Sequence, residues 1–425
     1  MKRLLLYWVA LMASAAHAES WVVTTDLWGN PSYQLLTLDR AGEQLSGDLD
    51  GDRLTGRASG NSFAFTVTDS RGATYSFDAR RAGDAMSGEA DFPDTNQPAM
   101  RARHRFSARR IPDRPAGGAR TLDYRPVDFS NSFDAGRLPV LTIWPGDIVH
   151  TETIDSGGVD AHGVTRALFG NPQTGPFFVA GAARGDTLVV HIRRLSLNRD
   201  WADSLDMIVG RALPNALAAK AGDLGKPVKW KLDRVNGRAS PEGASGALGG
   251  LSVPVRPMLG GLAVAPGFGS PPVSTGDTAR FGGNMDFNEV VTGNTVYLPV
   301  QQPGALLYLG DGHAAQGDGE TSQYALETSL DVEFSVALIK GKAINLPRVE
   351  SPTQIMALGQ AGSLDEALKA ATGGLIQWLQ QDYGLSLPEA AQLLGVAVRY
   401  TVANLAGRSV GVSARIDKAL LPARN

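Results

Sequence analysis

The chain has 425 residues, with no cysteine and only six histidines. The absence of cysteine excludes disulfides, cysteine nucleophiles and thiolate metal ligands, so any metal site must use histidine, carboxylate, carbonyl or water ligands. The formal net charge is only −3, which gives no electrostatic basis for binding nucleic acid or an anionic membrane. After the N-terminal segment, no apolar run is long enough to cross a bilayer. The sequence therefore predicts neither a nucleic-acid partner nor a membrane span.

Several common catalytic motifs are also missing from the sequence. No Gly-x-Ser-x-Gly elbow of a serine hydrolase is present, and Gly225-Lys226 is followed by proline, so it does not complete a phosphate-binding loop. No Gly-x-Gly-x-x-Gly stretch opens a helix after a strand. The remaining possibilities are carboxylate and histidine chemistry, with or without a metal ion.

The N-terminus has the pattern of a secretory signal. Lys2 and Arg3 precede an apolar stretch over residues 4–16, and Ala16-His17-Ala18 matches a small-x-small cleavage site. We expect residues 1–18 to be a signal peptide, with the mature chain beginning at Glu19 in the periplasm or outside the cell. The alternative is an anchoring helix that stays in place, although the apolar stretch is short for a span.

The composition favours strands and turns over helices. The chain has 50 glycines and only 7% aromatic residues. Residues 19–111 contain the repeated phrases LSG, LTG and MSG, and residues 62–68 and 73–78 alternate with a period of two. This pattern predicts a small antiparallel β-barrel or meander. Residues 112–120 have the composition of a linker, and a second domain follows over residues 121–425.

The second domain combines further strands with two late helices. Residues 187–192, 295–300 and 330–337 have strand length and strand patterning. Ser363 is a predicted N-cap with Glu366 as its capping-box partner, and Gly384 is a predicted C-cap. A second helix is predicted over residues 386–395. The sequence thus predicts a mainly β protein whose C-terminal helices cover a sheet.

Residues 310–320, GDGHAAQGDGE, place four ionisable groups among four glycines. Glycine allows tight bends that turn several side chains toward one point, as an acid/base or metal site requires. We expect His313 to be a metal ligand or proton carrier, and Glu320 to be the base that activates water. Asp311 and Asp318 are expected to form turns.

Two other polar clusters supply candidate partners. Glu152 and Asp155 alternate on a predicted strand, so both could face one site only if the chain bends near Thr153. Asp286 follows a glycine pair and is either a cation ligand or an Asx-turn residue, while Asn284 could donate to an oxyanion. The predicted metal ligands are Glu152, Asp155, Asp286 and His313, and the predicted catalytic residues are Glu320, His313 and Asn284.

The second domain resembles the acetamidase/formamidase family over about residues 121–425. The matching stretches, in chain order, are PGD at 145–147, ETID at 152–155, TGP at 174–176, GAARGDTL at 181–188, GGNMD at 282–286, YLPV at 297–300, GAL at 304–306 and residues 310–320. The resemblance implies a β-sandwich-like catalytic domain, often in a homo-oligomer. It implies hydrolysis of a small linear amide to a carboxylate and ammonia, with Thr174 and Gly175 binding the substrate. It is also compatible with a divalent cation, either zinc or calcium.

One departure from the family pattern leaves the function open. Asn171-Pro172 stands where many members have histidine-proline, and His162 is the candidate to substitute for the missing histidine. An alternative hypothesis is therefore a catalytically inactive binding protein of the cell envelope built on the amidase fold. A third is the same chemistry on a larger amide, with the first module helping to bind it.

Overall fold

The computed structural model describes residues 18–424, which form two compact units. The boundary between them in the sequence lies between residues 113 and 114. The predicted signal peptide lies outside the described residues, apart from Ala18. The first unit is a closed, eight-stranded antiparallel barrel in which each strand pairs with the next and the last pairs with the first. Its strands are β1 (Glu19–Leu27), β2 (Asn30–Ala41), β3 (Gln44–Leu49), β4 (Asp52–Ser59), β5 (Ser62–Thr68), β6 (Thr74–Ala82), β7 (Ala85–Pro93) and β8 (Arg101–Arg110).

The repeated Ser-Gly and Thr-Gly phrases mark points of close backbone approach in the barrel. A Cβ added at Gly47 would lie 2.0 Å from the carbonyl oxygen of Thr37, and one at Gly88 would lie 1.8 Å from that of Asp78. Neighbouring strands therefore leave no space for a side chain at these positions. Glycine in a strand interior commonly marks such a bend, and closure of a small barrel requires bends.

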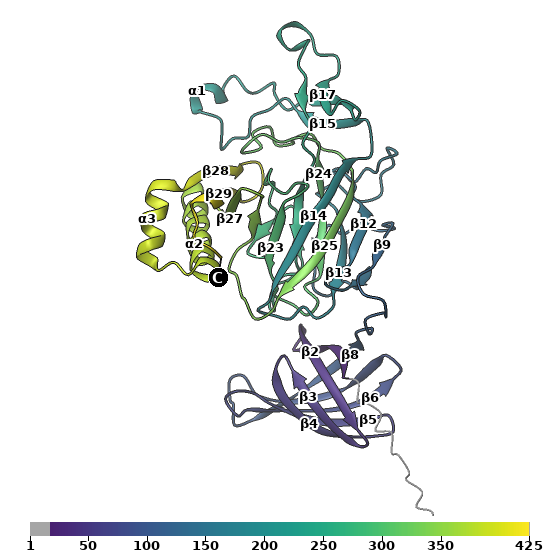
Figure 1. Ribbon diagram of the computed structural model, residues 1–425. Coiled ribbons are helices and arrows are strands. Elements are labelled where there is room, and N and C mark those ends of the chain that lie inside the picture. Colours follow the sequence, from purple (N-terminus) through teal and green to yellow (C-terminus); the bar gives the residue numbers. More distant parts are fainter. Residues whose placement is uncertain (1–17, 425) are drawn as a thin grey trace, which may run out of the picture. The chain divides into compact units, whose positions relative to one another are not determined.

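The second unit contains two large sheets and two smaller ones (Figure 1). The nine-stranded sheet has the order β28 (Arg399–Asn404), β29 (Val410–Asp417), β27 (Gln354–Ala361), β26 (Arg348–Glu350), β23 (Thr295–Pro299), β14 (Thr187–Leu197), β25 (Leu330–Ile339), β12 (Ile148–Glu152) and β9 (Thr121–Asp123). The six-stranded sheet has the order β11 (Leu141–Ile143), β13 (Gln173–Val179), β24 (Leu307–His313), β19 (Met258–Ala263), β22 (Gly282–Asn284) and β21 (Thr278–Ala279).

The smaller sheets lie outside these two. One is four-stranded, with β15 (Trp201–Leu205), β16 (Pro227–Asp233), β17 (Arg238–Pro241) and β18 (Val253–Pro254) in that order. The other pairs β10 (Ser132–Phe133) with β20 (Val273–Ser274). A short helix, α1 (Asn215–Ala218), lies between β15 and β16 in the sequence.

The two large sheets meet through buried aromatic side chains. Phe177 of β13 and Phe334 of β25 have ring centroids 5.4 Å apart at an angle of 71°, and both rings are fully buried. Tyr124, which follows β9, contacts Phe177 edge-on at 5.6 Å. Apolar surface removed from water in this way is the main stabilising contribution to a packed sheet pair.

The two long helices cover one end of the nine-stranded sheet (Figure 1). Helix α2 (Leu364–Tyr383) starts at Ser363, whose hydroxyl accepts from the backbone N–H of Glu366, and ends at Gly384 in the left-handed conformation. Helix α3 (Leu387–Ala397) starts with a complete capping box between Ser386 and Glu389. Both helix predictions are confirmed, except that Glu366 pairs with Lys369 and no return bond to Ser363 accompanies it.

The predicted fold class is confirmed: the protein is mainly β, with an N-terminal antiparallel barrel, further sheets and C-terminal helices. Among residues 18–424, no helix combines the length and the apolar character needed to span a bilayer.

The contact between α2 and β27 depends on one glycine. A Cβ added at Gly359 would lie 2.2 Å from the carbonyl oxygen of Ala367 and 2.3 Å from the backbone nitrogen of Ala371. The Gly359→Ala substitution must therefore push the helix from the sheet, and we expect it to lower the free energy of unfolding by about 1–3 kcal/mol. Urea titration of the purified protein measures this change.

Gly373 provides the matched control, because it is an exposed position of the same helix and an added Cβ there meets nothing within 4 Å. Gly373→Ala should raise stability by about 0.5–1 kcal/mol through helix propensity alone. Equal effects of the two substitutions would contradict the packing argument.

Candidate functional site

Strand β24 supplies the centre of the site. Asp311 and His313 lie two residues apart near its C-terminal end, so both side chains point to the same side of the strand. The neighbouring strand β19 has Gly260 opposite them, and a Cβ there would lie 2.5 Å from Oδ1 of Asp286 and 2.6 Å from Oδ2 of Asp311. The lack of a side chain at Gly260 therefore creates the space that the carboxylates occupy.

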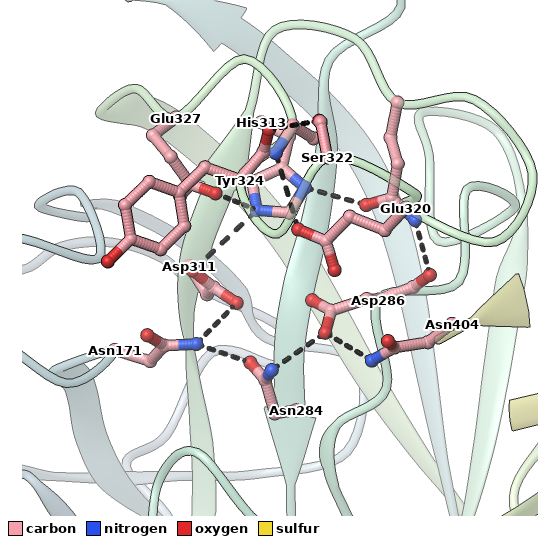
Figure 2. Close-up of polar contacts among 12 residues, drawn as sticks. Asn171, Asn284, Asp286, Asp311, His313, Glu320, Ser322, Tyr324, Glu327 and Asn404 are labelled. Carbon is pink, nitrogen blue, oxygen red and sulfur yellow. Dashed lines mark hydrogen bonds and ion pairs between the residues drawn. The ribbon is translucent and has the colours of Figure 1, made fainter. Parts of the chain in front are cut away.

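Five ionisable side chains converge at this point, and all are buried (Figure 2). Their exposed fractions are 2% for Asp286, 1% for Asp311, 1% for His313, 6% for Glu320 and 4% for Glu327. Four carboxyl groups thus surround one imidazole in a region closed to bulk water. Isolated charges are very costly to bury, so such a cluster requires protons or a cation as compensation.

Amide side chains hold Asp286 in place. Asn284 and Asn404 both donate from Nδ2 to Oδ2 of Asp286, at 2.7 Å and 2.5 Å. The other oxygen, Oδ1, is buried without a hydrogen-bond partner. Asp286 has a left-handed backbone with φ of 41°, a conformation that aspartate and asparagine adopt more readily than most residues.

Gln316 fixes the orientation of the His313 ring. Gln316 Nε2 donates to the carbonyl oxygen of Asp286 at 2.6 Å, which leaves Gln316 Oε1 as the acceptor for Nδ1–H of His313 at 2.8 Å. This network assigns the ring tautomer. Nε2 of His313 then points toward Glu327 Oε1 at 3.2 Å and Asp311 Oδ1 at 3.7 Å.

The surroundings shift the proton affinities of these groups strongly. Burial raises the pKa of Asp286 well above its usual value, and the charge of Asp311 adds to the rise. Burial and the charge of Asp286 likewise raise the pKa of Glu320. Burial alone would lower the pKa of His313, but the nearby Glu327 and Asp311 carboxylates outweigh it, so that pKa is raised. Clusters of perturbed groups of this kind concentrate at functional sites.

The donor atoms fit a metal ion. Asp286, Asp311 and His313 form one grouping, and His313, Glu320 and Glu327 form a second, each with one ligand atom per residue within 4.8 Å of the others. Oδ1 of Asp286, Oδ1 of Asp311, Nε2 of His313 and Oε2 of Glu327 are buried without hydrogen-bond partners. A mixed nitrogen and carboxylate donor set suits zinc, whereas calcium prefers oxygen ligands alone.

Two of the predicted metal ligands lie apart from these groupings. Asp155 forms an ion pair with the fully buried Arg199 at 2.8 Å and accepts from the backbone N–H of Val159. Glu152, at the end of β12, forms an ion pair with Arg125, and its side chain is 31% exposed. Arginines therefore neutralise both carboxylates, and neither residue belongs to a ligand grouping in the described part of the chain.

The predicted substrate-binding residues are buried within the six-stranded sheet. Thr174 donates from its hydroxyl to the carbonyl oxygen of Glu152 at 2.8 Å. Gly175 has φ of +124°, and a Cβ there would lie 2.7 Å from the carbonyl oxygen of Leu307. The Thr174 hydrogen bond connects β13 to β12, and the close approach at Gly175 leaves no space for a side chain. The substrate-binding role of these two residues stays a prediction.

Asn284 and Asn171 support the cluster from one side (Figure 2). Asn171 Nδ2 donates to Oδ1 of Asn284 at 2.7 Å and to Oδ2 of Asp311 at 3.0 Å. Asn284 therefore positions Asp286 through Nδ2, the same atom that its predicted contact with an oxyanion would use, and that role stays a prediction. His162 is exposed in a loop, and it belongs to neither ligand grouping in the described part of the chain.

Sequence reasoning missed part of the site. Asp311 was expected to form a turn but is buried in β24 within the cluster. Glu327 was given no role, although it pairs with His313 through an isolated β-bridge and a side-chain contact. Its proximity to the glycine-rich segment was the one available signal. Asp318 is exposed and accepts from Asn288, as expected of a loop residue.

Part of the chain matches a known protein family in sequence. Residues 271–397 match the sequence model of the Acetamidase/Formamidase family. A putative formamidase of Schizosaccharomyces pombe is 54% identical over 41 residues, a match that spans only 10% of this chain and 10% of that protein.

Solved structures match over most of the second unit. An acetamidase from Yersinia enterocolitica has a TM-score of 0.62 and 28% identity, covering 72% of this chain and 94% of its own. A predicted acetamidase/formamidase from Thermoanaerobacter tengcongensis has a TM-score of 0.60 and 25% identity, covering 71% of this chain and 97% of its own. An acetamidase from Bacillus halodurans has a TM-score of 0.59 and 27% identity, covering 69% and 97%.

Metal content tests the donor set directly. Asp286→Asn keeps the shape of the side chain and the left-handed backbone but replaces an anionic ligand atom with an amide. We expect it to weaken binding of zinc by more than the about 10- to 100-fold loss typical of outer-shell substitutions. Mass spectrometry of the purified protein and titration with Zn²⁺ measure the stoichiometry and the affinity.

Asp318→Asn is the control, because Asp318 lies in the same loop region but is exposed and outside both groupings. It should leave the metal content unchanged. Zinc that neither copurifies with the unsubstituted protein nor binds when added would contradict the site.

Proposed function

The chain belongs to the acetamidase/formamidase family, and from this premise we propose that it hydrolyses a primary amide to a carboxylate and ammonia. The observation that carries the proposal is the buried cluster of four carboxyl groups around one imidazole, with several ligand atoms left without partners. A structural core gains nothing from such an arrangement, whereas hydrolysis requires both a proton acceptor and a centre of positive charge.

Three residues are suited to hold a divalent cation: Asp286, Asp311 and His313. Asn284, Asn404 and Asn171 orient the two aspartates, and Gln316 orients the imidazole. A cation bound there would supply Lewis-acid polarisation of the amide carbonyl. Because Nδ1–H of His313 donates to Gln316, Nε2 would be the ligand atom of this residue, and we assign proton transfer to another residue.

Glu320 is the proposed general base. Burial and the charge of Asp286 raise the pKa of Glu320, so its carboxylate holds a proton more strongly than an ordinary glutamate does. The carboxylate removes a proton from water, and the water oxygen forms a bond to the carbonyl carbon. Protonated Glu320 then gives that proton to the amide nitrogen, the carbon–nitrogen bond breaks, and ammonia leaves. One water is consumed, and the carboxylic acid formed loses its proton to solvent.

Export and assembly form part of the same proposal. We infer from residues 1–18 that the chain is exported to the periplasm or secreted, and we infer from the family that it forms a homo-oligomer. Sequencing the N-terminus of protein from the periplasmic fraction tests export, with Glu19 as the expected first residue. Size-exclusion chromatography with light scattering tests assembly.

Replacing the base should stop the reaction without unfolding the protein. Glu320→Gln removes the proton acceptor but retains an oxygen that can accept from the backbone N–H of Ala325. We expect kcat to fall by at least about 10²-fold, in line with the contribution of a general base. Ammonia release from formamide, acetamide and propionamide, measured with Zn²⁺ supplied, gives the rate.

Glu366→Gln on the surface of α2 is the matched control and should keep full activity, because its side chain contacts only Lys369. Unchanged turnover in Glu320→Gln would remove Glu320 from this role. A zinc-loaded protein that releases no ammonia from any primary amide would instead favour the alternative, a binding protein on the same fold.

A further inference from the structure

A groove of about 430 Å³ adjoins the buried cluster. Glu320, the proposed base, lines the groove, and so does Gln316, which orients His313 in the cluster. The cluster is otherwise closed, because each of its five ionisable side chains is at most 6% exposed. The groove therefore offers a substrate a route to Glu320.

One wall of the groove comes from the four-stranded sheet. Leu205 of β15, Trp230 of β16 and Val253 of β18 line it, and Trp230 is fixed by donating from Nε1 to the hydroxyl of Ser204 at 2.8 Å. The opposite wall is the chain segment over residues 315–326, with Ala315 and Leu326 among its apolar members. The lining surface is mostly apolar, and Glu320 is its one charged residue.

The four-stranded sheet is attached at the catalytic cluster itself. Asp203 of β15 and Glu327 exchange two backbone hydrogen bonds, of 3.1 Å and 2.9 Å. Glu327 in turn contacts His313. The apolar wall therefore has a defined position relative to the reacting groups, as a substrate-binding surface requires.

The size of the groove is far beyond the needs of formamide or acetamide. Pockets of about 300 to 1,000 Å³ hold drug-sized ligands. A very small amide would leave most of the water in the groove in place, whereas a long apolar group would displace it from an apolar lining and gain binding free energy.

We propose that the groove binds the acyl group of the substrate, and that the preferred substrates are primary amides of medium-length or aromatic carboxylic acids. This inference rests on the proposed function, since it assigns the substrate class of the same site. The amide carbon lies at Glu320, and the apolar chain extends between Trp230 and the segment over residues 315–326. The leaving group remains ammonia, so the acyl side carries the specificity.

The test compares hexanamide with acetamide, using both ammonia release and direct calorimetric binding with the zinc-loaded full chain. We expect hexanamide to have a kcat/KM at least about tenfold above that of acetamide, because each methylene bound in an apolar pocket contributes a factor of about 10 or more. The binding constants should differ in the same direction.

Two substitutions fill the groove from opposite walls. Val253→Trp and Ala315→Phe should each lower the hexanamide-to-acetamide ratio of kcat/KM by at least about tenfold. Val235→Trp is the control, because Val235 is 94% exposed between β16 and β17 and lies outside the groove lining. It should leave the ratio and both rates unchanged. If one filling variant fails to fold, the other still decides the outcome.

The outcomes separate the two proposals. Equal affinity and equal kcat/KM for the two amides, or ratios that neither filling variant changes, would overturn the groove assignment while amide hydrolysis stands. Hexanamide binding that prefers the long chain and is lost in both filling variants, with no ammonia released, would support the groove and overturn hydrolysis.

Discussion

The buried negative charge at the end of β24 is the constraint on which the rest of the second unit depends. Four carboxyl groups and one imidazole are buried together, and His313 forms ion-pair contacts with two of the carboxyl groups, those of Asp311 and Glu327. Coulomb repulsion between such groups is weakly screened in a protein interior. The surrounding fold must therefore hold these groups against their mutual repulsion until a cation or protons compensate the charge.

The supporting residues divide this task. Asparagine side chains donate to Oδ2 of Asp286 and of Asp311, and they leave Oδ1 of each aspartate without an asparagine contact. Gly260 has no side chain, which leaves space for the two carboxylates. Behind the cluster, the buried Arg199 pairs with Asp155 and donates to the carbonyl oxygen of Glu327. Its guanidinium also lies 3.4 Å from the centroid of the Trp201 ring. Positive charge is thus placed next to the cluster without occupying its centre.

Much of this could be predicted from the sequence where the signal was local. The caps of α2 and α3, the period of β5 and the density of glycine and charge over residues 310–320 all depend on neighbouring residues, and the structure confirms the elements they indicate. Glu327, Asn404 and Arg199 could not be assigned in this way. Their roles arise from strand pairing and from contacts between residues far apart in the sequence. The ion pair between Asp155 and Arg199 is such a contact, and the sequence around Asp155 did not indicate it when Asp155 was predicted to be a metal ligand.

The two backbone hydrogen bonds between Asp203 and Glu327 connect the four-stranded sheet directly to the cluster. A sequence change that displaces β15 also displaces the backbone of a carboxylate next to His313. The distal strands β17 and β18 pair only within this sheet, so a change there leaves the hydrogen bonds between Asp203 and Glu327 in place. Substitutions at the far end of the sheet can therefore change which substrates the groove accepts without displacing the cluster residues.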